Sequence, residues 1–550
     1  MAVSSHRPPA GRPNYGRVTT APRRRRPVRY VVGFLFVAVI AVAIAGAVAL
    51  RAARGSLSAD SSALAHVTLP LGGGKIASVA VVSGPHANVV PVALRGNAVW
   101  PARTIAAGSQ VTIQVTLRRP GWMSWLTGST EHLSLTLQAP SARLAAQYVT
   151  LHGGAPLLVH FNAPVSVVGY GAPGHLTKLT LPAPSSDVTV PHQGVAGSVW
   201  VAAAPREWES AAATLVSWFP AGARASAVAS PAPGTPLSPG TPIMLTFSKP
   251  VSQALGHTLP PVSPVTPGSW HTLNAHSIVF RPEGVGYGLG AHVRVALPAG
   301  VTLANGTESA SGTLGSWRVP PGSTMRLQQL LANLGYLPLH FESSGPSVPL
   351  TATAQEGAAV APPAGHFSWL YGNVPSALRN QWAPGVSGVM THGAVMAFEN
   401  DHGLGADGDA GPLVWKSLIS ATLANQRSAF GYTFVDVSKN SQHLSLWHNG
   451  HTVLDTAVNT GIAAAPTASG TFAVYEHLRV TTMSGTNPDG SHYHDPGIQY
   501  VSYFNGGDAL HAFTRAQYGF PQSLGCVEMA LAPAGAVWPY TPIGTLVNVS

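Results

Sequence analysis

Cysteine is almost absent from this chain, because Cys526 is the only one in 550 residues. A single thiol excludes a fold that is held together by disulfides. If the chain is exported, an unpaired cysteine is open to oxidation. Its retention beside Gly525, fifteen residues after His511, therefore indicates a nucleophile. The alternative is a small buried apolar residue, which is how most free cysteines behave.

Charged residues are scarce as well. They make up 9% of the chain, against about 25% of an average soluble domain. Glycine (59) and proline (48) are abundant. Few charges, many turn formers and short runs of Val, Thr and Leu are typical of β-sandwich modules rather than helical ones. The length predicts roughly three or four domains.

Outside the N-terminal segment, the chain has no excess of positive charge. Residues 1–54 hold ten arginines and no acidic residue, and the whole chain has 30 Lys+Arg against 20 Asp+Glu. Subtracting the ten arginines leaves 20 of each sign. Because a nucleic-acid partner needs a basic folded surface, we expect no nucleic-acid binding.

Only one apolar run is long, from Val31 to Leu50, and it follows Arg23 to Arg26 and Arg29. Twenty apolar residues span about 30 Å as a helix, the thickness of a bilayer core. The arginines before the run place the N-terminus in the cytoplasm and the remainder outside the cell membrane. We therefore predict a basic cytoplasmic tail at 1–30 and a single-pass anchor at 31–50. The alternative is a cleaved signal peptide, whose apolar region usually has only about 7–15 residues.

Two β regions are expected after a short linker at 55–65. Residues 111–117 and 133–137 alternate apolar and polar side chains, which is typical of half-buried strands, and predict a β-sandwich region of one or two modules at 66–220. A strand that runs into Ser248-Lys249-Pro250-Val251 resembles the first strands of bacterial immunoglobulin-like wall modules. This resemblance predicts an Ig-like β module at 225–320. We assign no chemistry to either region.

The pattern becomes helical from residue 323. Ser323 is a candidate N-cap, helix-spaced apolar residues follow it, and Gly335 is a stop signal. With the segment 393–415, which contains a DG..GP..W turn, this helix resembles the two halves of the small helical peptidoglycan-binding domain. In this chain Glu399 replaces the usual Gln, and an insertion at 337–390 separates the halves. We predict such a domain at 323–424.

The C-terminal 430–550 segment carries the most specific motifs. Asn449-Gly450 between two alternating runs is a strong hairpin signal. Further on come Asn459-Thr460-Gly461, then P-T-x-x-G-T-F at 466–472, His511, the Ser523-x-Gly-Cys-Val motif and P-x-G-T-x-V at 542–547. This order resembles the L,D-transpeptidase catalytic domain of the YkuD type. The sequence thus predicts a multidomain, mainly β chain with a transmembrane helix, Ig-like β-sandwich modules, a helical peptidoglycan-binding-like domain and this catalytic domain.

The resemblance implies a role for each residue of the catalytic motif. Cys526 is the nucleophile and His511 the general base and acid, oriented by the backbone carbonyl of Ala512. The amides of Gly525 and Cys526 form the oxyanion hole, and Ser523 holds the loop by a hydrogen bond. A free thiol with a pKa of about 8.5 is mostly protonated at neutral pH and needs a histidine or local dipoles to act as a nucleophile.

Two positions depart from the family pattern. Leu524 stands where the family usually has His, and Glu528 where Arg or Asn is common, so we expect an altered contact with the donor peptide. The substrate-binding candidates are Ser523, Tyr475, Tyr493 and Glu528.

A lid is predicted at 475–510, a segment rich in Gly, Asn, Asp and Pro. It contains His492 and His494, which fit a metal site less well than solvated loop histidines, since a catalytic zinc needs three ligands and no further ligand motif is present. We predict neither a metal nor a cofactor.

The predicted activity is that of an extracytoplasmic cell-wall acyltransferase. Cys526 would accept the acyl group of a tetrapeptide stem with release of D-Ala and pass it to the amine of a diamino acid on a neighbouring stem, which makes a 3→3 cross-link. Carbapenems would acylate the same thiol. The alternatives are an L,D-carboxypeptidase and a catalytically degenerate wall-binding scaffold.

Overall fold

The computed structural model describes residues 28–70, 74–306 and 312–550. The predicted cytoplasmic tail lies almost entirely outside these residues. Helix α1 (Val28–Ala52) covers the predicted anchor. Its segment Phe34–Ala52 has a mean hydropathy of 2.5 and is not buried in the protein, and it is the one span in the described ranges that is long and apolar enough to cross a membrane. A signal sequence near the N-terminus has the same properties.

The first β module consists of two four-stranded sheets. One has the order β1-β2-β6-β5 and the other β4-β3-β8-β9. Val111, Ile113, Val115 and Leu117 alternate along β8 and fill the core between the sheets. The expected linker at 55–65 contains β1 and the fully buried Leu64. The elements are β1 (Ser56–Ala59), β2 (Ala65–Thr68), β3 (Lys75–Ser83), β4 (Asn88–Val89), β5 (Val92–Arg95), β6 (Ala98–Pro101), β8 (Gln110–Arg118), α2 (Gly121–Thr127) and β9 (Thr130–Gln138).

A second core belongs to a five-stranded sheet of order β10-β15-β13-β11-β12. A short pairing of β14 with β7 and the burial of Trp208 in the first core connect this part of the chain to the first module. Residues 56–220 thus have two separate cores. The strands are β7 (Ile105–Ala106), β10 (Tyr148–Leu151), β11 (Leu157–Ala172), β12 (His175–Val190), β13 (Gly197–Ala204), β14 (Glu209–Ser210) and β15 (Thr214–Pro220).

The third β region has a five-stranded sheet of order β19-β20-β17-β16-β22 and a three-stranded sheet of order β18-β21-β23. The expected strand before the Ser-Lys-Pro-Val sequence is β17, and Val251 already begins helix α3 after Pro250. The elements are β16 (Ala225–Ser230), β17 (Ile243–Phe247), α3 (Val251–Leu255), β18 (Val262–Ser263), β19 (Gly268–Asn274), β20 (Ser277–Pro282), β21 (His292–Ala296), β22 (Val301–Leu303) and β23 (Leu314–Arg318).

The segment that follows is mainly helical. The Ser323 hydroxyl accepts the Arg326 amide at 3.2 Å and caps α4, and Gly335 follows the helix with φ +87°, as the start and stop signals predict. One continuous core joins these helices to the third β region and to the first strands of the C-terminal domain. The elements are α4 (Thr324–Asn333), β24 (Leu339–Ser343), α5 (Ala352–Val360), β25 (Gly365–Trp369), α6 (Ser376–Arg379), α7 (Val389–Asp401) and α8 (Pro412–Leu423).

Two sheets form the C-terminal domain, with the orders β28-β27-β26-β34-β29 and β30-β31-β32-β33. Asn449 (φ +47°) and Gly450 (φ +89°) both adopt left-handed backbone and make the predicted hairpin turn. The elements are β26 (Thr433–Ser438), β27 (His443–His448), β28 (His451–Ala457), β29 (Gly470–Ala473), β30 (Glu476–Thr486), β31 (His492–Asn505), β32 (Asp508–Ala512), β33 (Val527–Met529), α9 (Leu531–Val537), the 3-10 helix η1 (Trp538–Tyr540) and β34 (Leu546–Val549).

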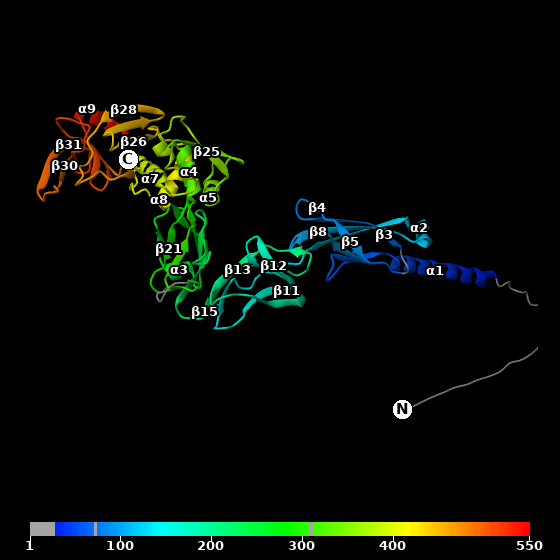
Figure 1. Ribbon diagram of the computed structural model, residues 1–550. Helices are drawn as coiled ribbons and strands as arrows, with labels where there is room; N and C mark the ends of the chain where they lie inside the picture. Colours follow the sequence, from blue (N-terminus) through cyan, green and yellow to red (C-terminus); the bar gives the residue numbers. More distant parts are fainter. Residues whose placement is uncertain (1–27, 71–73, 307–311) are drawn as a thin grey trace, which may run out of the picture.

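Figure 1 shows these parts following one another, with α1 at one end and the C-terminal domain at the other. The mainly β, multidomain fold class predicted from the sequence is confirmed.

Candidate active site

The parallel pairing of β32 with β33 brings the predicted catalytic residues together. His511 lies opposite Glu528, and Cys526 immediately precedes β33. Residues two apart along a strand share a face, so Cys526 projects to the same side of the sheet as Glu528 and His511. These three residues line a cavity of about 290 Å³, together with Tyr493 and Leu524.

His511 is held in one orientation and one protonation state. It is only 2% exposed, and its Nδ1 lies 3.0 Å from the carbonyl oxygen of Ala512. Because a carbonyl can only accept, Nδ1 carries the proton and the lone pair is on Nε2. Burial lowers the pKa of His511, so the ring is neutral and able to accept a proton.

The thiol of Cys526 is protonated in this state. Its Sγ donates to the carbonyl of Gly507 at 3.6 Å, and the described residues contain no hydrogen bond between Cys526 and His511. Burial raises the pKa of Cys526 to about 12, the Asp508 and Glu528 carboxylates add to this effect, and the Ala509 backbone opposes it. A thiol with a raised pKa needs a base to take its proton, and the neutral ring of His511 is the base in the same cavity.

The turn before the cysteine is fixed by one hydroxyl. The Ser523 side chain donates to the carbonyl of Cys526 at 2.6 Å and accepts the Gly525 amide at 3.3 Å. Gly525 has φ +121°, and a Cβ there would stand 2.3 Å from Oδ1 of Asp508. Only glycine fits this position. The Gly525 amide is occupied by Ser523, whereas the described residues offer no partner to the Cys526 amide, which is the available donor for an oxyanion.

The Asn459-Thr460-Gly461 motif supports the same turn from the other side. Asn459 exchanges two backbone hydrogen bonds with Glu528, at 3.0 and 2.9 Å, and the Thr460 carbonyl accepts the amides of Gln522 and Ser523. The backbone of this motif therefore stabilises the turn before Cys526.

The carboxylate of Glu528, a predicted substrate contact, forms an ion pair with Arg515. It is 4% exposed, and its two oxygens accept hydrogen bonds from Nε and Nη2 of Arg515, at 2.9 and 2.8 Å. The Arg515 side chain is 31% exposed and lines the cavity. We missed Arg515 in the sequence, although it is the only Lys or Arg after Arg479. A lone basic residue close in sequence to the unusual Glu528 is the pattern that could have indicated this pair.

The predicted lid is an antiparallel hairpin. Strands β30 and β31 pair over most of their length and turn at residues 487–491. His494 and His492 lie on β31 and pair with the hydroxyls of Ser484 and Thr486, so they are strand rather than loop residues. In the described part of the chain, no three His, Cys, Asp or Glu side chains gather in a way that could hold a metal ion.

The two tyrosine candidates differ in position. Tyr493 lines the cavity with Cys526. Tyr475 is not among the lining residues, because its ring stacks on Tyr503 and its hydroxyl donates to the Gly506 carbonyl. The structure therefore brings only Tyr493 to the cavity.

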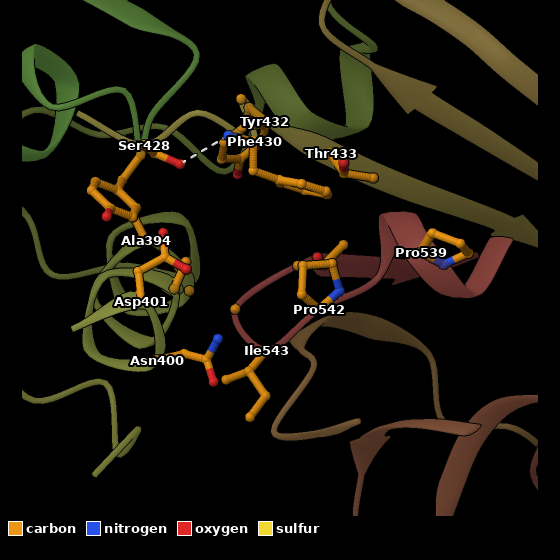
Figure 2. Close-up of a pocket in the computed structure, with 16 residues that line it drawn as sticks. Ala394, Asn400, Asp401, Ser428, Phe430, Tyr432, Thr433, Pro539, Pro542 and Ile543 are labelled. Carbon is orange, nitrogen blue, oxygen red and sulfur yellow. Dashed lines mark hydrogen bonds between the residues drawn. The ribbon is translucent and has the colours of Figure 1, made fainter. Parts of the chain in front are cut away.

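A second cavity, of about 220 Å³, lies between α7 and the C-terminal domain (Figure 2). Asn400 and Asp401 line one side, and Phe430, Tyr432 and Pro542 line the other. Neither the cysteine nor the histidine of the catalytic motif reaches it. It is thus separate from the candidate active site.

Comparison with known proteins gives one family. Residues 432–549 match the L,D-transpeptidase catalytic domain, YkuD. Among curated proteins, none matches this chain.

Several solved structures of L,D-transpeptidases are similar. A cysteine-to-serine mutant from Enterococcus faecium is 22% identical over 24% of this chain and 62% of its own, with a TM-score of 0.21. The E. faecium catalytic domain acylated by ertapenem is 26% identical over 22% of this chain and 97% of its own, with a TM-score of 0.20. The enzyme from Mycobacterium smegmatis is 10% identical over 58% of this chain and 96% of its own, with a TM-score of 0.20.

Proposed function

We propose that this chain, whose residues 432–549 match the L,D-transpeptidase catalytic domain of the YkuD family, makes 3→3 cross-links in peptidoglycan through an acyl-enzyme on Cys526. The observation that carries the proposal is the placement of Cys526 and a neutral, oriented His511 in one cavity. A partly exposed thiol that shares a cavity with a histidine whose Nε2 lone pair is free is an arrangement for nucleophilic catalysis.

The first half of the reaction forms a thioester. Nε2 of His511 takes the thiol proton as Sγ of Cys526 attacks the carbonyl carbon between the third residue of the stem and its terminal D-Ala. The carbonyl oxygen becomes an oxyanion that the Cys526 amide stabilises. The C–N bond then breaks, and D-Ala leaves as an amine with the proton from His511.

The second half transfers the acyl group. The side-chain amine of the diamino acid on a neighbouring stem attacks the thioester and gives a proton to His511. The C–S bond breaks, the new amide bond forms, and the proton returns to sulfur. With water in place of the amine, the same steps give an L,D-carboxypeptidase.

Arg515 is our candidate for recognising the donor stem. Its Nε and Nη2 are held by Glu528, and Nη1 has no hydrogen-bond partner among the described residues. Nη2 also donates to the Gln522 carbonyl at 3.3 Å, so Nη1 is the nitrogen that would donate to a carboxylate of the stem. Glu528 is thus a positioning residue for Arg515 rather than a direct substrate contact. Tyr493, which lines the same cavity, would pack against the bound peptide.

We also propose that α1 is an uncleaved anchor in the cell membrane, with the N-terminus in the cytoplasm and the catalytic domain at the wall. The β regions at 66–220 and 225–320 would then act as spacers, and the 323–424 region as a peptidoglycan-binding-like domain. Carbapenems would acylate Cys526, because their lactam carbonyl replaces the donor carbonyl.

The test is mass spectrometry of the full chain with a disaccharide-tetrapeptide. We expect a dimer that lacks one D-Ala, and its loss in Cys526→Ala and His511→Gln. Tripeptide without dimer would identify a carboxypeptidase. If neither product forms and a carbapenem adds no mass to Cys526, the chain is a scaffold. Arg515→Gln should raise KM for a donor with free carboxylates at least about tenfold, and raise it less for an amidated donor.

A further inference from the structure

The short helix α2, between β8 and β9, exposes a cluster of large apolar side chains. Trp122, Trp125 and Leu126 are 49%, 78% and 58% exposed, while Met123 is buried. No charged residue occurs between Arg119 and Glu131. Such a cluster on the surface of a protein marks an interaction site.

Three polar side chains of α2 make hydrogen bonds within the helix. The indole N–H of Trp125 donates to the Trp122 carbonyl at 2.8 Å, and the hydroxyls of Ser124 and Thr127 donate to the carbonyls of Gly121 and Met123. These internal hydrogen bonds lower the cost of moving the three side chains out of water.

Polar interactions connect helix α2 to the segment that follows the C-terminal end of α1. The amide of Gly55, three residues after α1 ends, donates to Glu131, and Glu131 pairs with Arg119. Arg119 in turn donates to the Thr127 carbonyl at the end of α2. A Cβ on Gly55 would stand 2.3 Å from Cδ1 of Leu117, so the chain leaving α1 touches β8 just before α2 begins. Figure 1 shows α2 beside the C-terminal end of α1.

We propose that α2 is a second membrane contact, seated in the boundary between the headgroups and acyl chains of the leaflet from which α1 emerges. Tryptophan is enriched at this boundary because it is amphipathic. Interfacial helices lie about 5–10 Å into it. The position of α2 beside the end of the apolar span, through Gly55, Glu131 and Arg119, favours the bilayer over a protein partner. Arg51 and Arg54, which end that span, would meet the lipid phosphates at the same level.

This contact would fix the angle of the first β module to the membrane. A single helix lets the module that it carries tilt and rotate, whereas two contacts at different points restrain both motions. The proposal rests on α1 being a membrane span, as in the proposed function, and not on the catalytic chemistry.

The test uses the full chain in lipid vesicles. Retention in the membrane pellet after alkaline carbonate extraction checks α1 alone. Nitroxide labels in a Cys526→Ala background then report depth at Leu126→Cys, with Val89→Cys as the matched control. Val89 is 80% exposed in β4, at the other end of the β3–β8 sheet from α2. We expect the label at 126 to be relaxed by oxygen more than by a nickel chelate, and the label at 89 to show the reverse.

Brominated lipids give an independent measurement. They should quench part of the tryptophan emission, and the quenched part should fall at least about threefold when Trp122 and Trp125 are both changed to Phe. Trp100→Phe in the same module should leave it unchanged. Equal quenching in all three proteins, or nickel access at 126 with α1 retained, would overturn the proposal. So would burial of the 126 label that depends on protein concentration, since that would identify a second copy of the chain.

Discussion

The Arg515–Glu528 pair predicts an unequal response to removing its two partners. Glu528 is 4% exposed and accepts two hydrogen bonds from Arg515, whereas the Arg515 side chain is 31% exposed. In Arg515→Gln, a nearly buried carboxylate loses its cation. Breaking a buried pair in this way costs about 3–5 kcal/mol. Because water reaches Arg515 and screens the pair, we expect about 2–3 kcal/mol.

The reverse substitution should cost less. In Glu528→Gln, the guanidinium can turn toward water, and the amide oxygen still accepts one hydrogen bond. We therefore expect a loss of only about 1 kcal/mol. The double variant should be more stable than Arg515→Gln alone, because it no longer buries an unpaired charge.

Hydrogen exchange of the β32 and β33 amides in the full chain measures these differences as local opening free energies. If Glu528→Gln costs as much as Arg515→Gln, the pair is not what stabilises this turn.

Three further predictions concern the cysteine turn. With its pKa raised to about 12, Cys526 should react with iodoacetamide on the order of 1000-fold more slowly than a free thiol at about pH 7.5, and Asp508→Asn should speed this reaction, as measured by mass spectrometry. Gly525→Ala should abolish carbapenem acylation because its Cβ meets Asp508, whereas Gly490→Ala, with φ +88° and no atom within 4 Å, should not. Ser523→Ala should slow acylation at least about tenfold by loosening the turn, with the thermal midpoint changing little; an unchanged acylation rate would contradict its role.

The sequence predicts the features that local chemistry determines. Asn449-Gly450 makes a hairpin because both residues tolerate left-handed backbone, and Ser323 caps α4 because its hydroxyl reaches the third amide of the helix. The placement of His511 beside Cys526 also follows from the order of the motifs, although its catalytic role stays a prediction.

Features that depend on distant partners are not predicted. Residues 56–59 carry no strand pattern and form β1 only because β2 pairs with them. The sequence alone does not show that Glu528 is paired, because its partner Arg515 lies thirteen residues earlier and meets it only in the folded chain. Tyr475 lies in a promising motif, but its ring packs on Tyr503 instead of facing the cavity.

The continuous core that joins the third β region, the helices and the C-terminal domain has a mechanical consequence. At its seam, Gly393 and Gly544 touch so closely that a Cβ on either would stand within 2.7 Å of the other's carbonyl oxygen. If residues 430–550 were produced without the preceding region, Phe434, Trp447 and Leu546 would lose part of the core that covers them. Because residues 225–306 and 312–550 share this core, we expect the third β region and the catalytic cleft to move together when the chain is pulled.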